Sequence, residues 1–584
     1  MFSKTPKFDQ AIKTYFANLK LNEKGGQERV CRFSGEKFYV RPEDVAFYQE
    51  MKVPLPTLSP LERWRRKIAF SSAYQFFKVK SAYSGKPIVS VFPSNTPFRI
   101  YEHEIWFSDQ WNPLSYGKVP SLNHSFFDQF QELQRAVPRP NLNTDSSNVN
   151  SEYTNNSLYL KNCYLTFDSL QGEDLYYFEC CLKNKACIDC WFCFDSDSCY
   201  RAHGKKMYRC FFCLQTEHAI ESYFLYDCRN CEHCFMCANL RNKKYCFYNT
   251  QLTKEEYEKR MHGINLGNYT VLQKYLHDFE ELQRNAIKRN LLGERWVNSV
   301  GNWMFNTKDC YHVLFAYDSE RVCYSIGFLG YRDSYDVVGG TNAERCYEFM
   351  TISSENNYGI KFSNFINNSR DLEYCDSCHN CHDCFGCIGL RNKSFCIFNK
   401  QYTQEEYWPL VDQLKTAMLA RGEYGEFFPP HLAPFPYNIS LNMAYPGFDD
   451  LEKAKQYGYW IADISEDEEQ IIDQHNMIRA GKLPLDIKDV DDTILEKIIV
   501  DETHNKKFKV TPFELAFYRE HNLPLPRINP FSRMAQWRKD FDLRLQFFET
   551  QCARCKKEIV TMYDSDKGIK NIYCEACYRE AVIQ

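Results

Sequence analysis

Four cysteines near the C-terminus have the spacing of a metal site. Cys552 and Cys555 form one Cys-x2-Cys motif, Cys574 and Cys577 form another, and the spacer from Lys556 to Tyr573 separates them. The two-residue interval lets one tight turn direct two sulfurs at one ion, and the spacer is long enough for a hairpin. Four buried thiols without a metal are the alternative interpretation. We predict a tetrahedral structural zinc site with these four cysteines as its ligands.

A second group of cysteines lies in the middle of the chain and is duplicated. The first copy recurs further along the chain, so that Cys228, Cys231, Cys234, Cys237 and Cys246 correspond to Cys378, Cys381, Cys384, Cys387 and Cys396. These sulfurs could bind several zinc ions or a cluster, with His233, His379 and His382 as additional ligands. They could instead be reduced thiols that fill a narrow interior as small hydrophobic groups. We favour the second interpretation, because the same column of positions continues through Ser, Thr, Ile and Leu.

The elements that position these cysteines follow from a period of three. Every third residue of each copy is small or apolar, and cysteine or apolar residues also recur 12 positions apart, as at Cys163, Leu175, Cys187 and Cys199. A period of three is neither the alternation of an ordinary strand nor the 3.6-residue period of a helix. It predicts a narrow β-solenoid (β-helix) with 12 residues per coil, in which equivalent positions stack about 4.8 Å apart. A wider coil, of twice that length, is the alternative. The pattern is similar to the coils of insect antifreeze β-helices, but their outward Thr-x-Thr ladder is missing, so ice binding is not implied.

Helices are predicted at both ends of each copy. The segments 130–135 and 279–284 share the pattern Phe-x-Glu-Leu-Gln-Arg and are amphipathic. Downstream of each copy, Thr253-x2-Glu256 and Thr403-x2-Glu406 are capping boxes that begin an exit helix. Such helices would cover the open ends of a solenoid, where strand edges lack partners.

The two ends of the chain are versions of one module. Residues Lys37 to Pro56 match Lys507 to Pro526, including the shared Phe-Tyr and Pro-Leu-Pro motifs. Further along, the positions of the four C-terminal cysteines hold residues that cannot form a thiolate site, namely Ser81, Ser84, Glu102 and Ile105. We therefore predict that the N-terminal module is a degenerate zinc ribbon, with Trp106, Trp111 and apolar packing in place of the metal. Cys31 is interpreted as a relic of another site.

The predicted fold is mainly β with α. Its parts are a degenerate zinc-ribbon-like module (1–125), a helix and first solenoid (126–262), a helix and second solenoid (263–425), a Pro/aromatic and acidic linker region (426–498), and the C-terminal zinc ribbon (499–584). The 72 basic and 76 acidic residues give a net charge of −4, so no global field favours nucleic acid. We find no signal peptide and no apolar membrane span, and we expect a cytoplasmic protein with reduced or metal-bound thiols.

Three motifs carry a resemblance to a known family. These are the Leu-Pro-Leu-Pro segment (523–526) before a two-motif ribbon, the Leu-Arg-Asn-Lys cap (240–243 and 390–393), and the Thr-x-Glu-Glu-Tyr helix start (253–257 and 403–407). Together they resemble an uncharacterised family of cysteine-rich, zinc-ribbon-tailed bacterial proteins, over nearly the whole chain. The resemblance implies the same domain organisation and no activity.

The sequence thus favours a non-enzymatic, zinc-binding scaffold that presents β-solenoid surfaces to a protein partner. Nucleic-acid binding is an alternative, because residues 63–67 and 533–539 place cations beside aromatic rings. A glycan-binding or thiol-redox enzyme is a second alternative, although the chain has no P-loop, dinucleotide fingerprint or nucleophile elbow. No catalytic or cofactor-binding residue is predicted beyond the zinc ligands, and the oligomeric state is not indicated.

Overall fold

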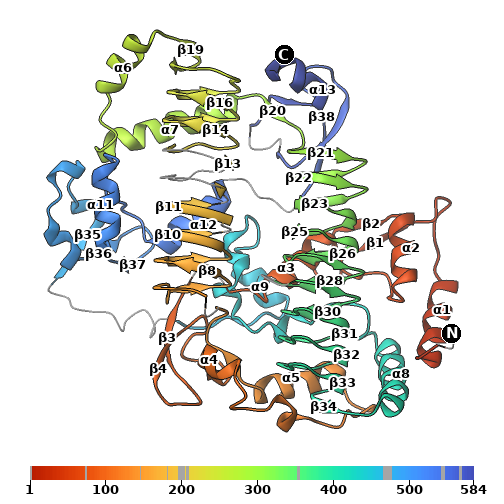
Figure 1. Cartoon of the computed structure of the whole chain (residues 1–584). Helices are drawn as coiled ribbons and strands as arrows, with labels where there is room; N and C mark the ends of the chain where they lie inside the picture. Colours follow the sequence, from red (N-terminus) through yellow and green to blue (C-terminus); the bar gives the residue numbers. More distant parts are fainter. Residues whose placement is uncertain are drawn as a thin grey trace. The chain divides into compact units, whose positions relative to one another are not determined.

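The chain forms a mixed α/β structure with many strands (Figure 1). The computed structural model describes residues 3–72, 75–144, 147–179, 182–191, 193–194, 204–205, 210–351, 355–464, 476–540, 546–564 and 568–583. It divides into two compact units. Unit 1 comprises residues 1–141, 291–464 and 544–546, and unit 2 comprises residues 142–290, 465–543 and 547–584. None of the helices in the described part of the chain is long and apolar enough to cross a membrane. Cys199 and the acidic run at 465–469 lie outside the described residues.

In unit 2, the strands of the first copy (residues 147–252) pair in parallel with a regular offset, except for the last two, which form an antiparallel pair. Leu170 pairs with Leu182, and Leu225 pairs with Cys237, so that each residue meets its equivalent one repeat further along the chain. The strands are short, and their bounds are β7 (Thr154–Asn155), β8 (Leu158–Lys161), β9 (Tyr164–Phe167), β10 (Leu170–Glu179), β11 (Leu182–Trp191), β12 (Cys193–Phe194), β13 (Gly204–Lys205), β14 (Glu217–Ile220), β15 (Tyr223–Tyr226), β16 (Arg229–Glu232), β17 (Phe235–Ala238), β18 (Cys246–Phe247) and β19 (Thr250–Gln251).

In unit 1, the strands of the second copy (residues 291–402) follow the same rule. Leu314 pairs with Ile326 and Leu372 with Cys384, whereas Tyr347 pairs with the more distant Lys361, because this part of the copy is longer by two positions. Figure 1 shows these strands in green as one stack. Their bounds are β21 (Gly293–Val297), β22 (Val300–Lys308), β23 (Tyr311–Tyr317), β24 (Glu320–Cys323), β25 (Ile326–Leu329), β26 (Arg332–Val338), β27 (Ala343–Glu344), β28 (Tyr347–Met350), β29 (Asn357–Tyr358), β30 (Lys361–Asn364), β31 (Arg370–Glu373), β32 (His382–Phe385), β33 (Ser394–Ile397) and β34 (Lys400–Gln401).

The backbone explains the period of three. Residues with positive φ recur at every third position, as at Asn156, Tyr159, Asn162, Leu165, Asp168, Gln171, Asp174 and Tyr177. Many of these corner positions hold Asn or Asp, the non-glycine residues that adopt the left-handed conformation most easily. Each corner turns the chain, so the residue that follows it is buried in the interior: Asn162 precedes Cys163, and Asn380 precedes Cys381.

Helices cover the copies within each unit. In unit 2, α7 (Tyr269–Asn285) packs on the first copy, where Phe279 contacts Phe224 at a ring distance of 5.7 Å. In unit 1, α5 (Phe126–Ala136) packs on the second copy, where Phe126 stacks on Phe398 at 5.1 Å. The predicted capping boxes at Thr253 and Thr403 are confirmed, and they begin α6 (Lys254–His262) and α8 (Gln404–Ala420).

The N-terminal segment (residues 3–125) lies in unit 1, and the C-terminal segment (residues 499–583) lies in unit 2 apart from residues 544–546. After the first element of each, a helix in one and a strand in the other, their elements match in order. The N-terminal segment has α1 (Pro6–Ala17), β1 (Gln27–Val30), β2 (Lys37–Val40), α2 (Pro42–Glu50), α3 (Pro60–Ile68), β3 (Phe77–Lys80), β4 (Pro87–Ser90), β5 (Ile100–Tyr101) and α4 (His103–Trp106). The C-terminal region has β35 (Met477–Arg479), β36 (Ile498–Asp501), β37 (Lys506–Phe508), α11 (Pro512–Glu520), α12 (Pro530–Asp540), β38 (Phe548–Gln551), β39 (Glu558–Thr561), β40 (Ile572–Tyr573) and α13 (Glu575–Tyr578).

Each terminal segment is attached to a copy by an equivalent buried ion pair. In unit 1, Arg63 of α3 donates to Asp336 at 2.8 Å, and in unit 2, Arg533 of α12 donates to Asp189 at 2.9 Å. All four side chains are buried. Loss of one member of a buried pair leaves an uncompensated charge, so removing either partner would destabilise the attachment of the segment.

Candidate metal centre

The four C-terminal cysteines lie on two neighbouring turns. Cys552 follows β38, and the turn after it closes with hydrogen bonds from the Cys552 N–H to the Lys557 carbonyl (2.8 Å) and from the Lys556 N–H to the Cys552 carbonyl (3.0 Å). Lys556 adopts a positive φ of 65°, which the tight turn requires. Cys574 is the N-cap of α13, and Cys577 lies on its first turn. A hairpin knuckle and a helix start thus bring the two motifs together.

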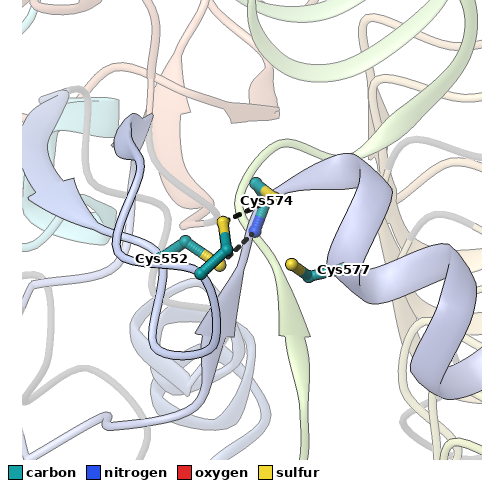
Figure 2. Close-up of side chains that lie close together, drawn as sticks. Cys552, Cys574 and Cys577 are labelled. Atoms are coloured by element: carbon teal, nitrogen blue, oxygen red, sulfur yellow. Dashed lines mark hydrogen bonds between the residues drawn. The ribbon is translucent and has the colours of Figure 1, made fainter.

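The sulfurs form a compact group. All four lie within 4.8 Å of one another. The Cys555 and Cys574 sulfurs are 3.7 Å apart, close to the separation of about 3.8 Å that follows from a tetrahedron with Zn–S bonds of about 2.3 Å. Figure 2 shows Cys552, Cys574 and Cys577 facing one another. Cys555 is exposed and the other three are buried, so the group lies just below the surface.

Backbone dipoles favour a thiolate at the centre of this group. Burial opposes ionisation of Cys552, but backbone N–H groups of Cys555, Cys574 and Arg554 outweigh it and lower the pKa of Cys552 to about 6. The Cys574 N–H donates to the Cys552 sulfur at 3.3 Å. These donors are typical of a sulfur that binds a metal as thiolate.

The cluster is tied to the first copy within unit 2. Strand β40 pairs in parallel with β20 (Lys288–Arg289), which follows α7. The Tyr578 hydroxyl, one residue beyond Cys577, donates to Asp227 at 2.5 Å and accepts from Arg241 at 2.6 Å. Arg241 also pairs with Asp227 at 2.9 Å. The helix that carries Cys577 therefore also carries a contact with the first copy.

The N-terminal segment has the same turns without the sulfurs. The Ser81 N–H donates to the Lys86 carbonyl and the Gly85 N–H to the Ser81 carbonyl, as in the knuckle at Cys552. The Ser81 hydroxyl donates to Glu102 at 2.5 Å, and the Ser84 hydroxyl donates to the other oxygen of the same carboxylate. Serine hydroxyls and a carboxylate thus replace the sulfurs with a hydrogen-bonded group.

The remaining residues predicted for the N-terminal module are also placed. Trp106 and Trp111 are buried, with their ring centres 5.7 Å apart. Cys31 is buried in a turn that closes like the knuckle at Cys552, because its N–H donates to the Glu36 carbonyl and its carbonyl accepts from the Gly35 N–H. The N-terminal segment thus combines a serine–glutamate hydrogen-bonded group with buried aromatic rings.

The described central cysteines do not form a group of this kind. In the described part of the chain, no other set of three or more His, Cys, Asp or Glu side chains brings its ligand atoms together in this way. Instead the thiols face backbone carbonyl groups, and the single S–H of Cys378 can donate to the carbonyl of Asp376 or to that of Cys387, each 3.6 Å from its sulfur. Burial raises the pKa of Cys237 and of Cys346 to about 12. These thiols fill the interior.

The three histidines considered as extra ligands have other partners. His233 stacks on Tyr245 at 5.2 Å and lies 3.3 Å from Glu221. Burial lowers the pKa of His379 to about 4, and its ring lies against Phe107 at 5.6 Å. His382 contacts Asp383 at 2.9 Å.

The basic residues at 63–67 are not exposed to solvent and so do not form a binding surface. Residues 62–68 of helix α3 are all buried, and Arg63, Arg66 and Lys67 are each at most 2% exposed. Glu348, which is fully buried, lies 3.6 Å from Arg66 and 3.5 Å from Lys67. These cations neutralise carboxylates inside unit 1. Arg533 is likewise buried, and the side chains of residues 537–539 lie outside the described residues.

Sequence reasoning missed the buried ion pairs that join Arg63 to Asp336 and Arg533 to Asp189. A signal was present, because the two arginines occupy equivalent positions of the terminal modules, three residues after Pro60 and Pro530. The aspartates that pair with these arginines are distant in the sequence, so only the structure identifies them.

The chain is rich in cysteine, and its C-terminal cluster of four cysteines could hold a metal ion such as zinc. No protein-family model, curated protein or solved structure matches this chain, so the resemblance to a cysteine-rich bacterial family stays a prediction.

Proposed function

We propose that this protein is a non-enzymatic, zinc-binding scaffold in which two narrow β-solenoids present surfaces to a protein partner. The observation that carries the zinc assignment is the group of four sulfurs at Cys552, Cys555, Cys574 and Cys577, all within 4.8 Å of one another. Zinc prefers tetrahedral coordination by four thiolates. Four protein ligands complete its coordination and leave no open position for a substrate. The site is structural.

The solenoid assignment is supported by the parallel pairing of residues 12 positions apart and by the positive-φ corners at every third residue. Inside the coils, sulfur and hydroxyl groups occupy equivalent positions. Ser363 donates to the Lys361 carbonyl at 2.7 Å, and Cys378 donates to the carbonyl at the same relative position. Cysteine is therefore a small residue that fills the interior and also satisfies a buried carbonyl.

Zinc would cross-link the two ends of the cysteine cluster in unit 2. By fixing α13 against the knuckle at Cys552, it would hold Tyr578 in its contacts with Asp227 and Arg241 of the first copy. Nucleic acid is not favoured as the partner, since Arg63, Arg66 and Lys67 are enclosed. Thiol-redox chemistry is not favoured either, since the described central thiols are buried.

Cobalt substitution tests the metal assignment. Co²⁺ in the full-length chain should give the intense visible d–d bands and the sulfur-to-cobalt charge transfer of a tetrahedral four-thiolate site. Cys574→Ser should remove this spectrum, whereas Cys384→Ser, a matched change in a central column, should keep it. A spectrum that survives Cys574→Ser or disappears in Cys384→Ser would refute the assignment.

A further inference from the structure

Unit 2 contains an open pocket with aromatic walls. It encloses about 390 Å³ between the first coils of the first copy and the start of α11. Its rings form a continuous series: Tyr153 lies 5.5 Å from Tyr164, Tyr164 lies 5.8 Å from Tyr176, and Tyr176 stacks on Phe513 at 4.3 Å. The volume falls in the range of small-ligand sites.

The charge of the pocket is negative. Glu152 and Asp174 contribute carboxylates, and no lysine or arginine is among the described residues that line it. Asp174 also accepts a hydrogen bond from Asn162 at 3.0 Å, which fixes its position in the wall. Ring faces beside carboxylates attract organic cations, and the attraction grows where the cation is partly withdrawn from water.

The corresponding place in unit 1 is filled by a cation of the chain itself. Tyr311 is the counterpart of Tyr164, because each tyrosine lies three residues after the lysine of an equivalent ion pair, Lys161–Glu173 in the first copy and Lys308–Glu320 in the second. The Arg41 guanidinium lies over the Tyr311 ring, 3.6 Å from its centre.

The guanidinium of Arg41 also pairs with Asp44 at 2.5 Å. Arg41 is the N-cap of α2, and the N-cap of the equivalent helix α11 is Thr511. Threonine cannot supply a cation. Unit 2 therefore keeps the ring and lacks the guanidinium that covers it in unit 1.

We propose that the pocket of unit 2 binds a guanidinium group supplied by a ligand, which lies over Tyr164 as Arg41 lies over Tyr311. Tyr153 and Tyr176 flank the group, and Asp174 and Glu152 balance its charge. A planar guanidinium suits this site better than an ammonium, because it stacks on an aromatic face while its edge donates to carboxylates. The ligand is free arginine or a related small molecule, or an arginine side chain of a peptide.

Calorimetric titration of the full-length protein tests this proposal. Two guanidinium probes, arginine methyl ester and the capped tripeptide Gly-Arg-Gly, distinguish the sources. Their controls are lysine methyl ester and Gly-Lys-Gly. We expect one saturable site per chain for at least one arginine probe and at least tenfold weaker binding of its lysine counterpart. Absence of saturable arginine binding, or equal binding of lysine, would overturn the proposal.

Variants locate the site. Asp174→Asn keeps an acceptor for Asn162 and should weaken binding about tenfold, whereas Glu173→Gln, on the same strand but outside the lining, should not. Thr511→Arg should abolish binding by placing a guanidinium over Tyr164. Each variant is checked for a native circular-dichroism melt. Wild-type affinity in both Asp174→Asn and Thr511→Arg would show that the bound cation lies elsewhere.

Discussion

Replacing Cys378 by serine should leave unit 1 folded and nearly as stable as the wild type. The Cys378 side chain is fully buried and donates to the Asp376 carbonyl at 3.6 Å. Ser363 shows that a hydroxyl fits such a position, because it donates to the Lys361 carbonyl at 2.7 Å and accepts from the Cys375 N–H at 3.0 Å. Serine at 378 can make the same kind of bond, so we expect a change within about 1 kcal/mol.

Alanine at the same position shows how much stability is lost when the side chain is removed. It removes one buried atom of roughly methylene size and leaves a small cavity, which should cost about 1–2 kcal/mol. For a unit of this size, a loss of about 1 kcal/mol corresponds to a shift in Tm of roughly 1–3 °C. Calorimetric melts of the wild type, Cys378→Ser and Cys378→Ala should therefore lie close together, with alanine lowest. A loss of bound metal in Cys378→Ser, or a fall in its Tm of more than about 5 °C, would refute the interpretation of these thiols as filler.

Three further predictions concern unit 2 and the N-terminal segment. Chelation or Cys574→Ser should free Tyr578 from Asp227 and make residues 547–583 sensitive to limited proteolysis, whereas Cys384→Ser should stay resistant. Burial raises the pKa of Glu514 from 4.5 to about 7. The resulting contribution of about 3 kcal/mol to the free energy of unfolding is therefore fully present below about pH 4.5 and is lost as the pH rises from there to about 7. Glu514→Gln should flatten the dependence of Tm on pH between 5 and 8, and an unchanged slope would contradict the assignment. Finally, native mass spectrometry should detect a second zinc ion in the variant that restores four cysteines to the N-terminal segment, namely Ser81→Cys, Ser84→Cys, Glu102→Cys and Ile105→Cys.

The features that depend on local spacing could be predicted from the sequence. The two-residue intervals at Cys552 and Cys574 are enough to predict a knuckle and a metal cluster, because each turn is formed by residues next to one another in the chain. The interval of 12 positions predicted the parallel register for the same reason, since Leu225 and Cys237 are equivalent positions of successive repeats. The shared motifs predict a degenerate module at 1–125, which stays a prediction, and in the structure Ser81 donates to Glu102.

The features that depend on distant partners could not be predicted. Residues 63–67 have the composition of an exposed nucleic-acid contact, yet Asp336 and Glu348 enclose them from β26 and β28, far along the chain. The pocket at Tyr164 was not predicted because two segments distant in the sequence form it. The proposed ligand class rests on a comparison with Arg41, which lies in the other unit. The predicted domain boundaries stay a prediction.

The number of zinc ions bound to the native full-length chain, measured by native mass spectrometry, tests the central claim most directly. One ion per chain, absent in Cys574→Ser, is the predicted result, because the described sulfurs gather only at Cys552, Cys555, Cys574 and Cys577. Three or more ions per chain, or ions lost on substitution of Cys234 or Cys384, would contradict the account.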